Sequence, residues 1–209
     1  DFVLVCDGKL TCELNIIVKS FQDEFKHIFH IVQIDENVGV GKAYNEGIKA
    51  CKCDYIVKMD SDDISLPNRC LKQMTLFAVM HKDIASYSKR RNPFNRQSVA
   101  FRKSFAEKIG GYSDLKMCED YEFIARMLQH GAKGQNIPEV LVRYRIDENT
   151  VDTRKSWEHT KAFIRVRWII HRSGYTGFRD FFMPCALQLG LFIFPRKFTR
   201  WVYRTFLRK

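Results

Sequence analysis

The stretch DYIVKMDSDDISLP, from Asp54 to Pro67, is the strongest indication of the fold class of this chain. Its apolar run from Tyr55 to Met59 is typical of a buried strand, and three acids, Asp60, Asp62 and Asp63, follow directly. In an open α/β sheet, ligands bind beyond the carboxyl ends of the strands. Neighbouring carboxylates repel one another unless a cation compensates their charge, and oxygen ligands suit Mg²⁺ or Mn²⁺. The stretch therefore predicts a metal site at a strand end, with a solvated acidic turn as the alternative.

Predicted strands and helices alternate on both sides of this stretch. Apolar runs predict strands at residues 2–8, 27–34, 55–59, 83–88, 98–102 and 137–146. Helical spacing of apolar residues predicts helices at residues 10–25, 42–51, 68–81, 104–109 and 119–130. Ser104 and Glu107 have the spacing of a capping box for the fourth of these helices. The alternation indicates an α/β fold with a parallel sheet and crossover helices.

The composition fits one globular domain, alone or with an appendage. The chain has 209 residues, of which 45% are hydrophobic and 28% are charged. Its seven cysteines have no C-x-x-C spacing, so we interpret them as reduced thiols in a cytosolic protein and do not expect zinc. The sequence opens on Asp1, directly in a predicted strand, so we expect an upstream portion to be missing.

The net charge of +11 is concentrated in the last third of the chain. Residues 143–209 hold 15 Lys and Arg against 5 Asp and Glu. Residues 181–194 are almost entirely apolar but too few to span a bilayer, which takes about 20 residues. Residues 195–209 place cations on one helical face and aromatic side chains on the other. This pattern predicts binding to an anionic membrane surface, with a helix packed on its own domain or on a partner as the alternative. Nucleic acid is not the expected partner.

A glycine-rich stretch, NVGVGKAYNEG, precedes the second predicted helix. It places Gly39, Gly41, Lys42 and Asn45 where the backbone can approach a ligand at a helix amino end. As a phosphate motif it is incomplete, because it has neither the Walker spacing nor a third glycine at the G-x-G-x-x-G position. Glycines that serve only a tight turn are the alternative.

The order of five motifs, FVLVCDG, NVGVGKAYNEG, MDSDD, a GGY turn and EDYEFIARML, resembles the family 2 glycosyltransferases. These are inverting enzymes of the GT-A fold, and the resemblance covers residues 1–145. It implies a GT-A domain at residues 1–150 that lacks its first strand and helix at the amino end. The chain from Trp157 onward is similar to members that elongate exopolysaccharides, which implies a membrane-associating helical tail at residues 151–209.

The resemblance also implies roles for single residues. Asp7 matches the acid that contacts the donor base, and a carboxylate that accepts from a ring N–H favours uracil or thymine. Asp60 is expected near the ribose, Asp62 on the metal, and Asp63 beside it. Gly39, Gly41, Lys42 and Asn45 are the further donor-binding candidates.

On the acceptor side, Asp120 matches the catalytic base, which takes the proton of the acceptor hydroxyl. Without the resemblance, Glu119 and Asp120 are favourable charges in the first turn of a helix. Arg96 stands where related sequences commonly carry His. Arg96, Glu119 and Trp157 are the acceptor-side candidates.

The predicted activity is metal-dependent, inverting transfer of a hexosyl or N-acetylhexosaminyl group from a nucleotide-diphosphate sugar, expected to be a UDP-sugar. The expected acceptor is a saccharide or a lipid-linked saccharide at the cytoplasmic face of the membrane. Two alternatives remain open: a non-catalytic module that binds anionic membranes or nucleic acid, and a nucleotidyltransferase of similar sheet architecture.

Overall fold

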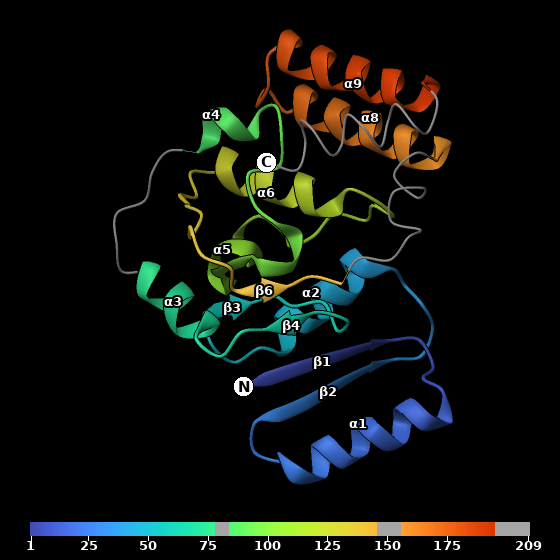
Figure 1. Cartoon of the computed structure of the whole chain (residues 1–209), viewed down its shortest axis with the longest axis vertical. Coiled ribbons are helices and arrows are strands. Elements are labelled where there is room, and N and C mark those ends of the chain that lie inside the picture. Colours follow the sequence, from blue (N-terminus) through green and yellow to red (C-terminus); the bar gives the residue numbers. More distant parts are fainter. Residues whose placement is uncertain (78–83, 146–155, 195–209) are drawn as a thin grey trace.

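The computed structural model describes residues 1–77, 84–145 and 156–194 (Figure 1). At one end of the molecule, β1 (Phe2–Asp7) pairs in parallel with β2 (Phe29–Ile34), and α1 (Cys12–Glu24) connects them. The predicted strand, helix and strand are thus confirmed. Thr11 begins α1 as its N-cap, because its side-chain oxygen accepts the N–H of Leu14 at 3.3 Å.

The next helix, α2 (Val40–Ala50), packs closely on β1. A Cβ atom on Gly47 would lie only 2.9 Å from Val5 Cγ2, so glycine permits the close approach. Two antiparallel pairs complete the strands of the described chain: β3 (Tyr55–Val57) with β5 (Ala100–Arg102), and β4 (Ile64–Ser65) with β6 (Val142–Arg143). Helices flank this mixed arrangement, and the predicted α/β class is confirmed (Figure 1).

Three local predictions were wrong. Residues 83–88 were expected to be a strand, but α4 (Ala85–Ser88) is a helix. Tertiary contacts override the local pattern there, since Tyr121 donates to the Ser88 carbonyl at 2.7 Å. The strand expected at residues 137–146 is reduced to the two residues of β6. The capping box is absent, because α5 (Lys103–Lys108) begins before Ser104, whose N–H donates at 2.8 Å to the distant Asp54.

The core surrounds α6 (Glu119–Gln129), in which nine residues are buried. Phe123 of α6 packs edge to face on Phe101 of β5, with ring centroids 5.3 Å apart. On the other side of α6 lies α8 (Trp157–Arg172), whose Val166 and Ile170 belong to the same buried cluster. These contacts place the amino end of α6 between the strands and the C-terminal helices.

The C-terminal helices form a layer of their own above α6 in Figure 1. Here α9 (Phe178–Ile193) packs along α8, and the buried Arg167 of α8 lies 4.5 Å from the ring centroid of Tyr121. Helices predicted within residues 151–209 are therefore confirmed for α8 and α9, whereas residues 195–209 lie outside the described residues. None of the helices described is both long enough and apolar enough to cross a bilayer.

The chain between β3 and α6 contains two further elements that matter for the site. The helix α3 (Arg69–Leu76) follows β4, as predicted for the amino part of residues 68–81. A 3₁₀ turn, η1 (Arg96–Ser98), precedes β5 and carries Arg96. All seven cysteines are free, and their redox state in the cell stays a prediction.

Candidate active site

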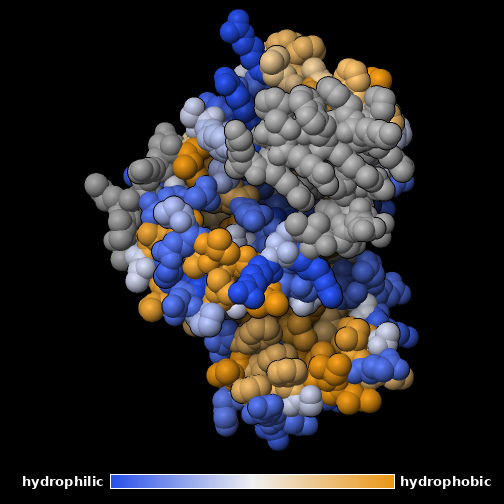
Figure 2. All heavy atoms as spheres, in the orientation of Figure 1, coloured by the Kyte–Doolittle hydropathy of each residue, from blue (hydrophilic) through white to orange (hydrophobic). Residues whose placement is uncertain are grey.

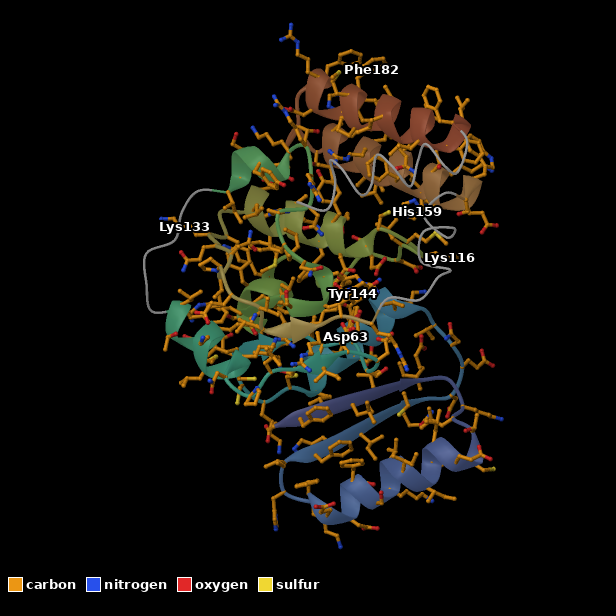
Figure 3. The ribbon with its side chains drawn as sticks, in the orientation of Figure 1. Asp63, Lys116, Lys133, Tyr144, His159 and Phe182 are labelled. Carbon is orange, nitrogen blue, oxygen red and sulfur yellow. The ribbon has the colours of Figure 1, made fainter. Side chains whose placement is uncertain are left out.

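Three carboxylates follow β3 and lie together. Ligand oxygens of Asp60, Asp62 and Asp63 all lie within 4.8 Å of one another. Asp63 is buried near the centre of the molecule (Figure 3), and its Oδ1 accepts the Arg145 N–H at 3.0 Å. Its Oδ2 is buried without a hydrogen-bond partner in the described part of the chain. Because an unpaired buried carboxylate oxygen is costly, this cluster fits a hard cation such as Mg²⁺ or Mn²⁺.

Asp60 is held by two donors from different parts of the chain. Tyr44 of α2 donates its hydroxyl to Oδ1 at 2.9 Å, and Arg96 of η1 donates to Oδ2 at 3.2 Å. Burial, followed by the charge of Asp60, raises the pKa of Tyr44 far above its usual value. Tyr44 therefore remains a neutral donor, and the carboxylate of Asp60 is fixed between α2 and η1.

Asp120, the predicted base, lies against a buried lysine. Lys58 directly follows β3, and its Nζ donates to Asp120 Oδ1 at 2.6 Å, with both side chains almost completely buried. The same ammonium lies 4.0 Å from the ring centroid of Tyr44, a cation–π contact. Arg96 Nε lies 3.7 Å from Asp120 Oδ2. Arg96 thus joins the predicted base to Asp60, so the structure brings these two predicted acids into one cluster.

Glu119 precedes Asp120 and is also buried. Burial, and then the negative charge of Asp120, raise the pKa of Glu119 to about 7. Glu119 is therefore mostly protonated below neutral pH, which relieves the repulsion between the two adjacent carboxyl groups. The residue before them, Cys118, begins α6 in the left-handed region at a φ of 62°. Such backbone strain in a non-glycine residue is typical of functional sites.

Asp7 holds the loop that leads into α2. Its Oδ1 accepts the Val38 N–H at 2.8 Å, and its Oδ2 accepts the Gly39 N–H at 3.1 Å. Gly39 has a φ of 89°, which glycine adopts without strain. The contact of Asp7 or Gly39 with the donor stays a prediction.

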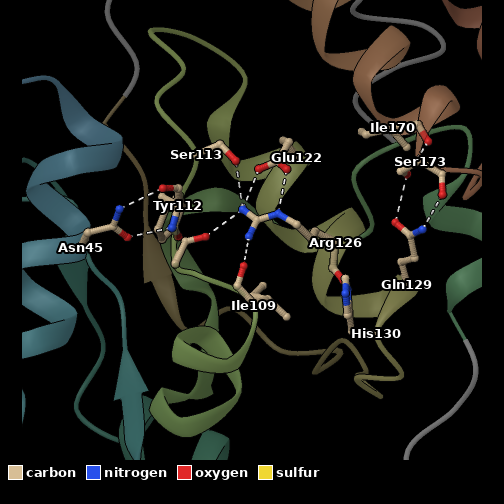
Figure 4. A network of polar contacts seen from close by, with 11 residues as sticks. Asn45, Ile109, Tyr112, Ser113, Glu122, Arg126, Gln129, His130, Ile170 and Ser173 are labelled. Atoms are coloured by element: carbon tan, nitrogen blue, oxygen red, sulfur yellow. Dashed lines mark hydrogen bonds and ion pairs between the residues drawn. The ribbon is translucent and has the colours of Figure 1, made fainter.

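The other residues of the glycine-rich stretch pack α2 against the segment 109–114. Both groups of the Asn45 amide bond the backbone of Tyr112, at 2.8 and 2.7 Å (Figure 4). A Cβ atom on Gly41 would lie 3.0 Å from the Ser113 carbonyl oxygen, and Lys42 pairs with Asp114 at 2.9 Å. These contacts favour the structural alternative for the three residues, and donor binding by any of them stays a prediction.

A network centred on Arg126 fixes the same segment to α6 (Figure 4). Arg126 pairs with Glu122 through two hydrogen bonds of 2.8 and 2.9 Å. It also donates to the Gly111 carbonyl at 2.7 Å and to Ser113 Oγ at 3.1 Å. Since Tyr112 in turn bonds Asn45, this network couples the helix that carries Asp120 to the helix that carries Tyr44.

Three residues of this site, Tyr44, Lys58 and Arg126, were not predicted from the sequence. The one available signal was Lys58, a charged residue inside an otherwise apolar run that ends at the acid cluster. A lysine in a buried strand needs a counter-charge. That partner is Asp120, which is 62 residues further along the chain and thus not apparent from the local pattern.

Trp157, predicted on the acceptor side, begins α8. Its ring packs on Phe192 of α9 at a centroid distance of 5.5 Å, and Lys161 Nζ lies 5.3 Å from the ring centroid. These contacts belong to the pair of C-terminal helices, and an acceptor contact of Trp157 stays a prediction.

A separate cavity of about 560 Å³ lies between α3, β5 and α6. It is lined largely by apolar side chains, including Phe94, Phe105 and Leu128, and none of the predicted site residues lines it. The cavity is therefore distinct from the acid cluster.

Comparisons with known proteins give one family and one fold. The model of the family described as Glycosyl transferase family 2 matches residues 1–129. An uncharacterized glycosyltransferase of Haemophilus influenzae is 31% identical, over all of this chain and 88% of its own length. The UDP-Gal:alpha-D-GlcNAc-diphosphoundecaprenol beta-1,3-galactosyltransferase of Escherichia coli is 28% identical, over all of this chain and 86% of its own.

Among solved structures, the mannosyltransferase PcManGT from Pyrobaculum calidifontis, in complex with GDP-Man and Mn²⁺, superposes with a TM-score of 0.67. The match covers 91% of this chain and 59% of that protein, at 13% sequence identity. At this identity the likeness concerns the fold alone, and it confirms the predicted GT-A fold.

Proposed function

This chain belongs to glycosyl transferase family 2, and we propose that it transfers a hexosyl or N-acetylhexosaminyl group from a UDP-sugar to a hydroxyl of a lipid-linked saccharide. The broader role, a glycosyltransferase of polysaccharide or lipid-linked saccharide biosynthesis, follows from the family and its relatives. The name of the E. coli relative supports both the UDP-sugar donor and the lipid-linked acceptor. A lipid-linked acceptor in turn favours peripheral action at the cytoplasmic face of the membrane.

The observation that carries the proposal is the position of Arg96 between Asp60 and Asp120. Its guanidinium lies 3.2 Å from Asp60 Oδ2 and 3.7 Å from Asp120 Oδ2. Asp60, proposed on the donor side, and Asp120, the proposed base on the acceptor side, are therefore separated only by the side chain of Arg96. Arg96 is half exposed, so it can turn toward a diphosphate or an anionic acceptor without unfolding a core contact.

In the proposed reaction the acceptor hydroxyl attacks the anomeric carbon of the donor. Asp120 takes the hydroxyl proton, the new glycosidic bond forms, and the bond between the sugar and the diphosphate breaks on the opposite face, which inverts the configuration. The bonding electrons leave with the nucleoside diphosphate. Lys58 orients the Asp120 carboxylate by occupying its Oδ1, so Oδ2 is the oxygen available to the proton.

Asp60, Asp62 and Asp63 are the residues that would hold a divalent cation. The buried, unpartnered Oδ2 of Asp63 fits that role, and so does a donor set made only of oxygens. When bound, Mg²⁺ or Mn²⁺ would neutralise the charge of the departing diphosphate.

Calorimetric binding of UDP with and without Mn²⁺ tests the donor side of the proposal. We expect Mn²⁺-dependent binding that is lost in Asp62→Ala and kept in Asp23→Ala, a matched change of an exposed acid on α1. Asp120→Asn should bind UDP normally but lose transfer, because a base acts in the transition state. Turnover of nucleoside triphosphates instead would indicate the nucleotidyltransferase, and absence of nucleotide binding would indicate the non-catalytic module.

A further inference from the structure

The outer face of α9 is apolar from Phe182 to the end of the helix, and the exposed Arg179 lies in its first turn. The large hydrophobic side chains exposed on this helix recur at helical spacing and are Phe178, Phe182, Met183, Leu187, Leu189 and Ile193. Met183 is 67% exposed and Ile193 76%. Figure 2 shows hydrophobic atoms at the α9 end of the molecule, and Figure 3 shows Phe182 on the outer side of the helix. No charged residue occurs in α9 after Asp180.

The exposed face of α8 is different, because it combines tryptophans with cations. Its exposed residues at positions i, i+4, i+8, i+11 and i+15 share one face and are Trp157, Lys161, Arg165, Trp168 and Arg172. Glu158 is the exposed acid of this helix. The buried face of α8, with Val166 and Ile170, packs on the core instead.

The two tryptophans join these faces into one surface. Trp157 contacts Phe192, and Trp168 contacts Phe181 edge to face at a centroid distance of 5.6 Å. On α9, Phe181 neighbours the exposed Phe178 and Phe182, which stack on each other at 5.7 Å. Across the surface the order is therefore an apolar row, a row of tryptophans and a row of cations.

We propose that this α8–α9 surface docks on an anionic lipid bilayer, with the α9 row inserted at the level of the acyl chains. In an interfacial helix the apolar face enters the membrane, tryptophans lie at the headgroups, and cations contact anionic headgroups, which is the order seen here. The chain that follows adds charge of the same sign, since residues 195–209 contain six Lys and Arg and no Asp or Glu.

The charge distribution favours a bilayer over a second copy of the chain. In a twofold dimer the same patch of both copies meets, so Lys161, Arg165 and Arg172 of one copy would approach the same cations of the other. An anionic surface instead neutralises this row. Delivery of the active site to a lipid-linked acceptor rests on the proposed function, whereas the docking itself does not.

Flotation of the full chain with vesicles tests the proposal. We expect binding to vesicles of phosphatidylcholine with roughly one quarter phosphatidylglycerol, weakened by salt and by omission of the anionic lipid. Phe182→Gln with Met183→Gln should lower the partition coefficient about tenfold or more, because both side chains would leave the acyl region. Ile16→Gln, a change of a side chain 70% exposed on α1, is the matched control and should have no effect. Equal flotation of the double variant and the wild type would overturn the proposal.

Fluorescence quenching by brominated lipids separates this surface from the segment after it. In Trp201→Phe, the remaining tryptophans are Trp157 and Trp168, and we expect them to be quenched on binding to vesicles. Loss of quenching in this variant would assign docking to residues 195–209 and refute the α8–α9 surface. Binding of UDP with Mn²⁺ is measured on the same proteins, so a failure of the proposed transferase would be seen independently of vesicle binding.

Discussion

Replacing Lys58 by Met removes the buried partner of the proposed base while nearly conserving side-chain volume. In the wild type, Lys58 Nζ lies 2.6 Å from Asp120 Oδ1, and the two side chains are 4% and 10% exposed. The remaining cation near Asp120 in the described chain, Arg96, lies further away, at 3.7 Å. In the variant, the buried Asp120 carboxylate therefore has only a more distant counter-charge.

The loss of stability expected for Lys58→Met follows from the burial of this ion pair. Removing one partner of a buried ion pair costs about 3 to 5 kcal/mol, whereas an exposed pair contributes about 0.2 to 1 kcal/mol. Because Lys58 also orients the Asp120 carboxylate, its loss should lower the rate of transfer as well as the stability.

The assay is kcat for sugar transfer, together with urea unfolding. For Lys58→Met we expect kcat to fall and the free energy of unfolding to fall by about 3 kcal/mol, with UDP affinity little changed. The control is Lys49→Met, because Lys49 pairs with Glu46 at 2.7 Å on the exposed surface. It should leave kcat unchanged and lower the free energy of unfolding by less than about 1 kcal/mol.

If Lys58→Met kept the wild-type kcat while its stability fell, Lys58 would be a core residue with no influence on the base. If neither quantity changed, the buried ion pair itself would be in doubt.

Two further predictions concern stability. The pKa of Glu119, raised from 4.5 to about 7 by burial and by Asp120, means that the folded state favours the protonated carboxyl. Protonated Glu119 therefore stabilises the fold fully below pH 4.5, and about 3 kcal/mol of stability is lost as the pH rises through 7. Glu119→Gln should abolish this loss in urea unfolding measured between pH 4 and 9. An unchanged pH dependence of stability in the variant would contradict the prediction. Gly110 and Gly111 both have positive φ, but only at Gly111 would a Cβ atom meet Asn45 Oδ1, at 2.4 Å. In thermal melting, Gly110→Ala should lower the free energy of unfolding by about 1 to 2 kcal/mol. Gly111→Ala should lower it by about 2 kcal/mol more, since it also disrupts both hydrogen bonds of Asn45. Equal losses of stability would show that the contact with Asn45 is unimportant.

The fold class and the position of the acid cluster could be predicted from local sequence patterns. Apolar periodicity records which face of a local segment is buried, so β1, α1, β2 and α2 were predicted in order. The abrupt change from an apolar run to Asp60, Asp62 and Asp63 is likewise local, and it marks the end of β3 without reference to the rest of the chain. The resemblance added Asp120 as a candidate base.

Which side chains contact one another depends on tertiary packing. Local periodicity carries no information about partners, so it could not pair Lys58 with Asp120, turn the Asn45 amide toward Tyr112 or direct Arg126 to the segment before α6. Residues 85–88 form a helix rather than the expected strand for the same reason, because a distant side chain bonds their backbone. The charge state of Glu119 and the chemistry of Asp120 depend on burial and on neighbours that are distant in sequence, and packing alone brings these together.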